Sequence, residues 1–129
     1  MFGVPLIGAD ICGFNGDTNE ELCARWHALG AFYPFSRNHN ADTAREQDPA
    51  VLGANVTAAA KTALEWKYSL LPYLYTLFYK AHTSGDTVVR PLFFEFVTDA
   101  KSYEIETQFL WGPAVMVVPT LEERATTVC

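Results

Sequence analysis

Two short apolar runs near the start of the chain predict buried strands, and a helical pattern lies between them. Residues 3–9 and 31–35 are almost wholly apolar without alternation, which is typical of parallel strands covered on both faces. Between them, Leu22, Trp26 and Leu29 recur at helical spacing. The order strand, helix, strand predicts a βαβ unit with a right-handed crossover.

Capping residues predict both ends of this first helix. Thr18 is expected at the N-cap and Glu21 at the third helical position, because together they match a capping box. Gly30 is expected to stop the helix, since glycine adopts the left-handed conformation that often follows a last helical turn.

A polar loop and a long helix follow. Residues 41–53 are largely polar and predict a loop over the strand ends, and residues 55–82 carry a sustained apolar stripe at helical spacing. Pro72 lies inside this stripe and predicts a kink or break near Tyr68. We expect the aromatic side chains of this helix to pack against a sheet rather than to stack on sugars; they are Trp66, Tyr68, Tyr73, Tyr75 and Tyr79.

The pattern changes after the helix stop at residues 84–86. Residues 88–97 and 110–119 predict strands of a second, antiparallel sheet, because no helix lies between them. The predicted fold class is therefore α/β followed by β, with one unit at 1–85 and another at 86–129. Two parallel strands and two or three antiparallel ones leave unpaired edges, so we expect a piece of a larger protein.

Composition excludes several classes of function. The 129 residues are half apolar, with 9 basic and 15 acidic side chains and a net charge of −6. Nucleic acid is an unexpected partner, because neutralising phosphates requires a basic surface. The sequence contains no uninterrupted apolar run of about 18 residues, so we predict no membrane segment. No motif for a cofactor is present, and none is expected.

The cysteines leave two interpretations open. Cys12, Cys23 and Cys129 include no C-x-x-C pair, so we expect no metal site. Cys12 and Cys23 are either a disulfide or two buried thiols, and their spacing does not decide between these. A glycosylation sequon begins at Asn55 and slightly favours a secretory compartment.

Polar side chains follow both predicted parallel strands. Asp10 comes directly after the first apolar run, and Arg37 and His39 come after the second. Because carboxyl ends of parallel strands meet at one edge, these side chains predict a binding site there. His27 and His82 lie on predicted helices outside any motif, and we expect structural or surface roles for them.

Several strings, in this order and spacing, resemble glycoside hydrolase family 31, and within it the branch of maltase, sucrase-isomaltase and lysosomal acid α-glucosidase. The strings are Gly8-Ala9-Asp10-Ile11-Cys12-Gly13-Phe14, Glu21-Leu22-Cys23-Ala24-Arg25-Trp26, Gly30-Ala31-Phe32-Tyr33-Pro34-Phe35, Arg37-Asn38-His39-Asn40 and Leu71-Pro72-Tyr73-Leu74-Tyr75. The resemblance implies the last two βα units of a (β/α)8 TIM barrel, followed by the first strands of an antiparallel β-sandwich. It also implies hydrolysis of terminal α-linked glucose with retention of configuration.

The resemblance does not extend to the catalytic pair. Retaining hydrolysis uses a carboxylate nucleophile and a carboxylic acid about 5–5.5 Å apart. In the family both aspartates lie on earlier barrel strands, in strings that this chain lacks. Gly16-Asp17 and Gly85-Asp86 share only a dipeptide with the acid's string and lack its tryptophans. No catalytic residue is therefore expected here, and the isolated chain is predicted to be inactive.

Part of a substrate pocket does carry over by resemblance. His39 matches the histidine that hydrogen-bonds the hydroxyls of the terminal glucose. Asp10 matches a pocket aspartate whose charge favours an oxocarbenium-like transition state, and Arg37 is expected to orient it. Phe14 matches an aromatic at the pocket rim. The implied partners are an α-glucoside oligosaccharide and the rest of a parent polypeptide.

The resemblance also gives the cysteines a meaning. In this branch the residues matching Cys12 and Cys23 form a disulfide, which implies the lumen of the secretory pathway, lysosomal or extracellular. Cys129 has no counterpart. The alternative to a partial α-glucosidase is a truncated, non-catalytic product that binds sugar weakly or associates with other chains.

Overall fold

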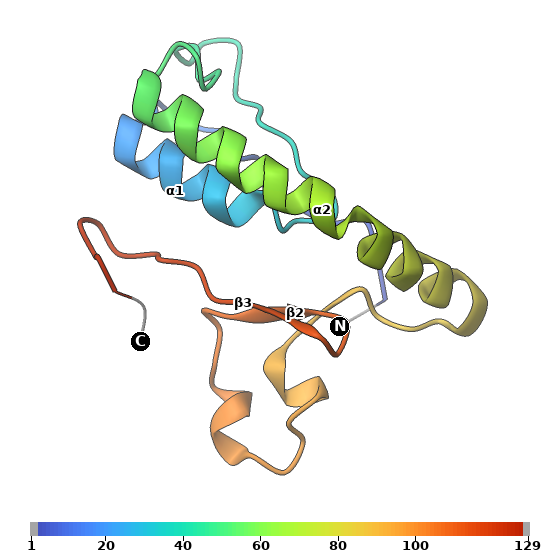
Figure 1. Cartoon of the computed structure of the whole chain (residues 1–129). Helices are drawn as coiled ribbons and strands as arrows, with labels where there is room; N and C mark the ends of the chain where they lie inside the picture. Colours follow the sequence, from blue (N-terminus) through green and yellow to red (C-terminus); the bar gives the residue numbers. More distant parts are fainter. Residues whose placement is uncertain (1–2, 128–129) are drawn as a thin grey trace.

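Two helices form the larger layer of the computed structural model, which describes residues 3–127. Helices α1 (Glu20–Gly30) and α2 (Ala54–Ser84) lie side by side and run in the same direction (Figure 1). Their N-terminal ends are joined by Asn55, whose Nδ2 donates to Glu20 Oε1 at 2.9 Å. Residues 41–53, in the connection between the helices, contain no helix or strand, as predicted.

The smaller layer is a three-stranded antiparallel sheet in the order β1, β2, β3. Its strands are β1 (Val89–Arg90), β2 (Phe109–Trp111) and β3 (Val115–Val117), and two 3₁₀ helices, η1 (Leu92–Phe94) and η2 (Ala100–Tyr103), separate the first two. In register, Val89 lies opposite Trp111, and Phe109 opposite Val117. The antiparallel prediction is thus confirmed.

The strands themselves are shorter than predicted. Only two residues of the segment 88–97 are in a strand, because Pro91 has no backbone donor and its carbonyl accepts a turn bond from Phe94 N at 3.1 Å. The segment 110–119 belongs to two strands instead of one, since a turn at Gly112 reverses the chain. The backbone at Gly112 has φ 53°, which favours glycine.

The two predicted parallel strands are not strands in the structure. Residues 7–11 and 35–38 are side by side and parallel, but they share one isolated bridge, between Ile11 and Asn38. Phe35 N donates to Ile7 O at 2.9 Å, and Ile11 N donates to Arg37 O at 2.8 Å. Among residues 3–127 no further segment extends this pairing, so a ladder does not form.

The carbonyl groups of residues 31–33 have other partners, which also explains the missing strand. Lys67 Nζ donates to Ala31 O at 2.9 Å and to Tyr33 O at 2.8 Å. Trp111 Nε1 donates to the carbonyl between them, Phe32 O, at 2.6 Å. Burial lowers the pKa of Lys67. A cation at the C-terminal end of α1 also interacts favourably with the helix dipole.

Both predicted ends of α1 are off by one residue. Asn19 is the N-cap, because its extended backbone lets its side chain accept from Leu22 N at 2.9 Å. Thr18 is buried one position earlier, and Glu21 binds Arg25 instead of completing a capping box. Gly30 is the last helical residue rather than a stop, and a Cβ there would lie 2.4 Å from Ile11 Cγ1. Close packing therefore explains this glycine.

Helix α2 agrees closely with its predicted range but differs in two respects. It runs through Pro72 as one helix, so the predicted break is absent, and the kink expected as the alternative stays a prediction. It ends as predicted, with Gly85 in the left-handed conformation at φ 72°. Of its five aromatic side chains predicted to pack against a sheet, Tyr73 packs with the core around Trp111 and the other four are exposed; they are Trp66, Tyr68, Tyr75 and Tyr79.

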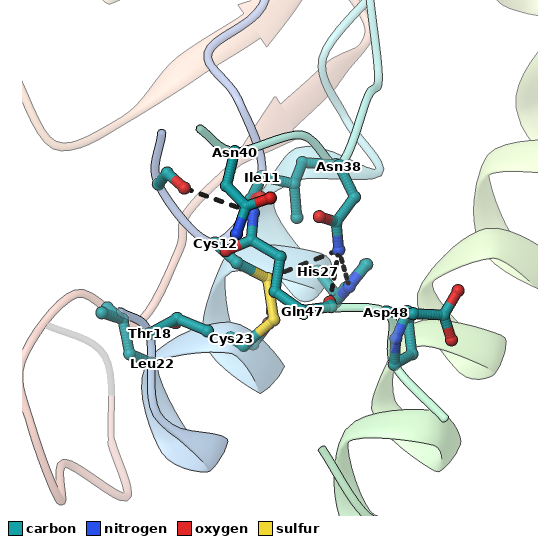
Figure 2. Close-up of a disulfide and its surroundings, with 12 residues drawn as sticks. Ile11, Cys12, Thr18, Leu22, Cys23, His27, Asn38, Asn40, Gln47 and Asp48 are labelled. Carbon is teal, nitrogen blue, oxygen red and sulfur yellow. Dashed lines mark hydrogen bonds between the residues drawn. A yellow bond between two sulfur atoms is a disulfide. The ribbon is translucent and has the colours of Figure 1, made fainter. Parts of the chain in front are cut away.

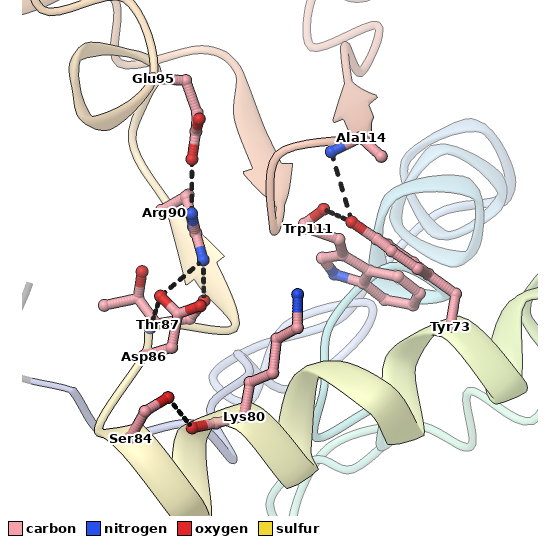
Figure 3. A network of polar contacts seen from close by, with 9 residues as sticks. All are labelled: Tyr73, Lys80, Ser84, Asp86, Thr87, Arg90, Glu95, Trp111 and Ala114. Atoms are coloured by element: carbon pink, nitrogen blue, oxygen red, sulfur yellow. Dashed lines mark hydrogen bonds and ion pairs between the residues drawn. The ribbon is translucent and has the colours of Figure 1, made fainter.

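The core of the second unit joins the sheet to α2. Trp111 is fully buried and packs with Leu74, Leu77 and Val88. Tyr73 Oη donates to the Trp111 carbonyl at 2.7 Å, as Figure 3 shows. The helix and the sheet are therefore held together by one tryptophan, through both its ring and its backbone.

A buried arginine organises the chain just after α2. Arg90 Nη2 donates to Asp86 Oδ1 at 3.0 Å and to Thr87 O at 2.6 Å, and Arg90 Nη1 pairs with Glu95 (Figure 3). The Arg90 side chain is only 9% exposed, so solvent does not replace these partners easily. The network fixes the path from α2 into β1.

Candidate substrate-binding site

Two loop segments carry all four predicted pocket residues. Segment 10–14 includes Asp10 and Phe14, and segment 37–40 includes Arg37 and His39. The segments are adjacent, because Ile11 N donates to Arg37 O at 2.8 Å and Ala41 N donates to Phe14 O at 3.1 Å. The structure thus brings the predicted residues together, although neither segment follows a regular strand.

Asp10 and Arg37 face each other across the two segments. Arg37 Nε lies 3.8 Å from Asp10 Oδ1, with the side chains 46% and 31% exposed. A pair this exposed adds little to stability. Both groups therefore keep hydrogen-bonding capacity toward solvent, where a carboxylate accepts from hydroxyl groups and a guanidinium donates to them.

Phe14 and His39 form the second pair across the segments. Their ring centroids are 5.5 Å apart and the rings are tilted by 40°. Both side chains are exposed, so the imidazole is available to donate and accept hydrogen bonds. A hollow of about 500 Å³ adjoins His39 and is walled on its other side by residues 46–51. Asp10, Arg37 and Phe14 do not line this hollow, so the four residues do not enclose one common cavity.

A disulfide lies beneath these residues. Cys12 and Cys23 are bonded, with their Cα atoms 4.6 Å apart, so the open question between disulfide and free thiols is settled in favour of the disulfide (Figure 2). Cys12 has φ 74°, an uncommon conformation for a residue with a side chain. The bond ties segment 10–14 to α1. Cys129 lies outside the described residues.

One group of possible metal ligands is present among residues 3–127. Cys12, Cys23 and His27 place their ligand atoms within 4.8 Å of one another, and all three are buried. Metals bind the thiolate form of cysteine, and both sulfur atoms are consumed by the disulfide. In this state the cluster offers a metal ion only one good donor, the imidazole.

Sequence reasoning missed a buried polar cluster that surrounds the disulfide. Asn38 Nδ2 donates to Gln47 O at 3.0 Å and lies 3.2 Å from His27 Nε2. Gln47 Nε2 donates to Ile11 O at 3.1 Å and to Gly13 O at 3.2 Å. Asn38 lies in the motif Arg37-Asn38-His39-Asn40, of which only Arg37 and His39 were predicted to be site residues. No motif in the polar loop distinguishes Gln47.

The two histidines outside the motif have different environments. His27 is buried, so of the two predicted roles, structural or surface, it has the structural one. Burial lowers its pKa, and the Asp48 carboxylate opposes that shift. His82 is exposed in the last turn of α2. The sequon residue Asn55 is exposed near the start of α2, although its amide is bonded to Glu20.

Comparison with known proteins assigns the chain to a family. Residues 1–77 match the TIM-barrel domain of glycosyl hydrolases family 31, and residues 85–129 match the family 31 C-terminal domain. The chain belongs to glycoside hydrolase family 31. It is 55% identical to human (Homo sapiens) intestinal sucrase-isomaltase over 130 residues, which cover 99% of the chain and 7% of that protein.

Other relatives of this family 31 chain agree. Lysosomal α-glucosidase of Mus musculus is 54% identical over 128 residues, covering 99% of the chain and 13% of that protein. A probable α-glucosidase of Oryza sativa subsp. japonica is 56% identical, covering 99% of the chain and 14% of that protein. The crystal structure of a glucosidase II α subunit superposes with a TM-score of 0.89 at 36% identity, covering 96% of the chain and 14% of that structure.

The family 31 chain thus spans about a seventh or less of the length of these relatives. Among residues 3–127, no helix combines the length and the apolar character needed to cross a bilayer.

Proposed function

We propose that this chain is the glucose-binding wall of a retaining α-glucosidase that acts on maltose-type oligosaccharides. The observation that carries the proposal is the pairing of Asp10 with Arg37 and of Phe14 with His39 on two adjacent segments. His39 binds hydroxyls of the terminal glucose, Asp10 favours the positive charge of the transition state, Arg37 orients Asp10, and Phe14 borders the second sugar.

In this proposal the nucleophile and the general acid lie elsewhere in the parent polypeptide. The chain supplies the last two βα units of the barrel as residues 1–85 and the start of the β-sandwich as residues 86–129. The family matches, at 1–77 and 85–129, support this division. The parent enzyme works in the lumen of the secretory pathway, lysosomal or extracellular; the disulfide, the sequon at Asn55 and the lysosomal and intestinal relatives support that location.

The test is a chimera in which this chain replaces the matching 128 residues of mouse lysosomal α-glucosidase. We expect the chimera to hydrolyse maltose, and we expect His39→Ala to lower its kcat/KM roughly tenfold or more, because hydrogen bonds to the sugar are lost. His82→Ala is the matched control and leaves kcat/KM unchanged, since His82 is exposed on α2. An active chimera indifferent to His39→Ala contradicts the proposal.

The alternative is a truncated, non-catalytic module that binds sugar or associates with other chains, and the exposed aromatic side chains of α2 favour it. The chimera separates the proposals. Both expect no turnover of maltose by the isolated 129-residue chain, whereas only the glucosidase proposal expects an active chimera. Self-association of a well-folded chain, together with an inactive chimera, favours the module.

A further inference from the structure

The buried contacts beneath the pocket extend from α1 to both loop segments. Asn38 lies between Arg37 and His39, and neighbours in an extended segment point to opposite sides. The Asn38 side chain is half-buried and directed inward, toward the disulfide, as Figure 2 shows. Its position therefore determines how the two flanking side chains are displayed outward.

The hydrogen-bond donors of Asn38 are matched to acceptors. The Gln47 carbonyl accepts from Asn38 Nδ2 at 3.0 Å, and a carbonyl does not donate, so the amide nitrogen must face it. The same nitrogen lies 3.2 Å from His27 Nε2 and, farther away, 3.7 Å from Cys12 Sγ. His27 completes the arrangement only as a neutral imidazole with Nε2 as acceptor.

Gln47 joins the other segment to the same cluster. It is only 4% exposed. While its main-chain carbonyl holds Asn38, its side-chain Nε2 donates to Ile11 O and Gly13 O, at 3.1 and 3.2 Å. One buried residue thus binds segment 37–40 through its backbone and segment 10–14 through its side chain.

A second feature shows that Gln47 is held at a cost. Its Oε1 is buried without a hydrogen-bond partner among the described residues. A buried unpaired carbonyl is unfavourable, and the two bonds donated by the same side chain offset that cost. The two donor bonds to segment 10–14 are what this side chain contributes.

We propose that His27, Asn38 and Gln47 are positioning residues that hold segments 10–14 and 37–40 in the one register that presents Asp10, Phe14, Arg37 and His39 to glucose. This inference rests on the proposed function. Each pair of pocket residues takes one member from each segment, so a small shift between the segments separates both pairs at once. The three residues act through the pocket side chains and do not touch sugar.

The test compares two substitutions of His27 in the chimera with mouse lysosomal α-glucosidase. His27→Gln keeps an acceptor near the Nε2 position, whereas His27→Leu keeps bulk but removes the acceptor. We expect His27→Leu to raise both KM for maltose and the inhibition constant of glucose about three- to tenfold, as for loss of one buried hydrogen bond. His27→Gln stays within about twofold, and His82→Leu, the matched control, changes neither constant. Equal impairment by the Gln and Leu variants, or none by either, overturns the proposal.

Amide hydrogen exchange in the 129-residue chain gives a readout that does not depend on activity. His27→Leu and Gln47→Glu should each lower protection in segments 10–14 and 37–40 together by about tenfold, because a glutamate cannot donate to Ile11 O and Gly13 O. Protection lost in only one segment contradicts the linkage. If protection is lost in both segments but the chimera is inactive, the proposed function is refuted, whereas the connection of the two segments through His27, Asn38 and Gln47 is supported.

Discussion

The disulfide between Cys12 and Cys23 makes a quantitative prediction about stability. It closes a loop with a sequence separation of 11 residues. In the chain-entropy treatment, a loop of that length lowers the entropy of the unfolded state by about 9 cal/mol/K, or about 2.8 kcal/mol at 25 °C. Reduction leaves both sulfur atoms in place, so packing changes little and the entropy term should dominate the result.

The assay is urea unfolding of the 129-residue chain, with and without a dithiol reductant, followed by far-ultraviolet circular dichroism. Cys129→Ser is present throughout, so that only the two paired cysteines remain. With a slope of about 1–3 kcal/mol/M, the reduced chain should unfold at about 1–3 M less urea. A shift below about 0.3 M at an unchanged slope refutes the entropy argument. The double variant Cys12→Ala, Cys23→Ala is the control, and its unfolding midpoint should not respond to the reductant because it has no bond to reduce.

Four further predictions concern the stability of the same chain. Lys67→Met should lower the free energy of unfolding by about 1.5–3 kcal/mol in urea titrations, because Ala31 O and Tyr33 O lose a charged donor, and Lys67→Arg should lower it less. Trp111→Ala should cost about 3–5 kcal/mol in the same assay, since the ring is fully buried, whereas loss of the Phe32 bond alone in Trp111→Phe should cost roughly 1 kcal/mol. Gly30→Ala should destabilise by about 1–3 kcal/mol, and less in an Ile11→Ala background, because the new Cβ meets the Ile11 side chain; additive effects in a double-mutant cycle contradict this contact. Since the pKa of His27 is lowered by folding, the unfolded chain takes up the proton first as pH falls below about 6.5, so thermal stability should decrease from there downward, with a smaller decrease in His27→Gln.

Periodic and capping signals predicted much of the helical structure. Helix α2 differs from its predicted range by one residue at the start and two at the end, because its apolar stripe is long and Gly85 provides a left-handed stop. The error at the start of α1 comes from two neighbouring residues that can both cap a helix. Thr18 and Asn19 are both good caps, and only the backbone conformation shows which one accepts from Leu22 N.

Tertiary contacts set the limits of the remaining predictions. An apolar run such as residues 31–35 predicts a strand, but whether its carbonyls pair with a neighbour or with Lys67 and Trp111 depends on residues far along the chain. The four predicted pocket residues were identified through their motif, and they lie on two adjacent segments. Gln47 was not found, because its side-chain bonds are to Ile11 O and Gly13 O, more than 30 residues away.

The bond from Trp111 to Phe32 spans 79 positions of the sequence and reaches the turn just before segment 37–40. It has a consequence for how variants of this protein are classified. Under the proposed function, a substitution at Trp111 should impair glucose binding although Trp111 is not one of the four predicted pocket residues, so it would be mistaken for a contact residue in a screen that scores activity alone. A screen that also records folding would separate such variants from changes at His39.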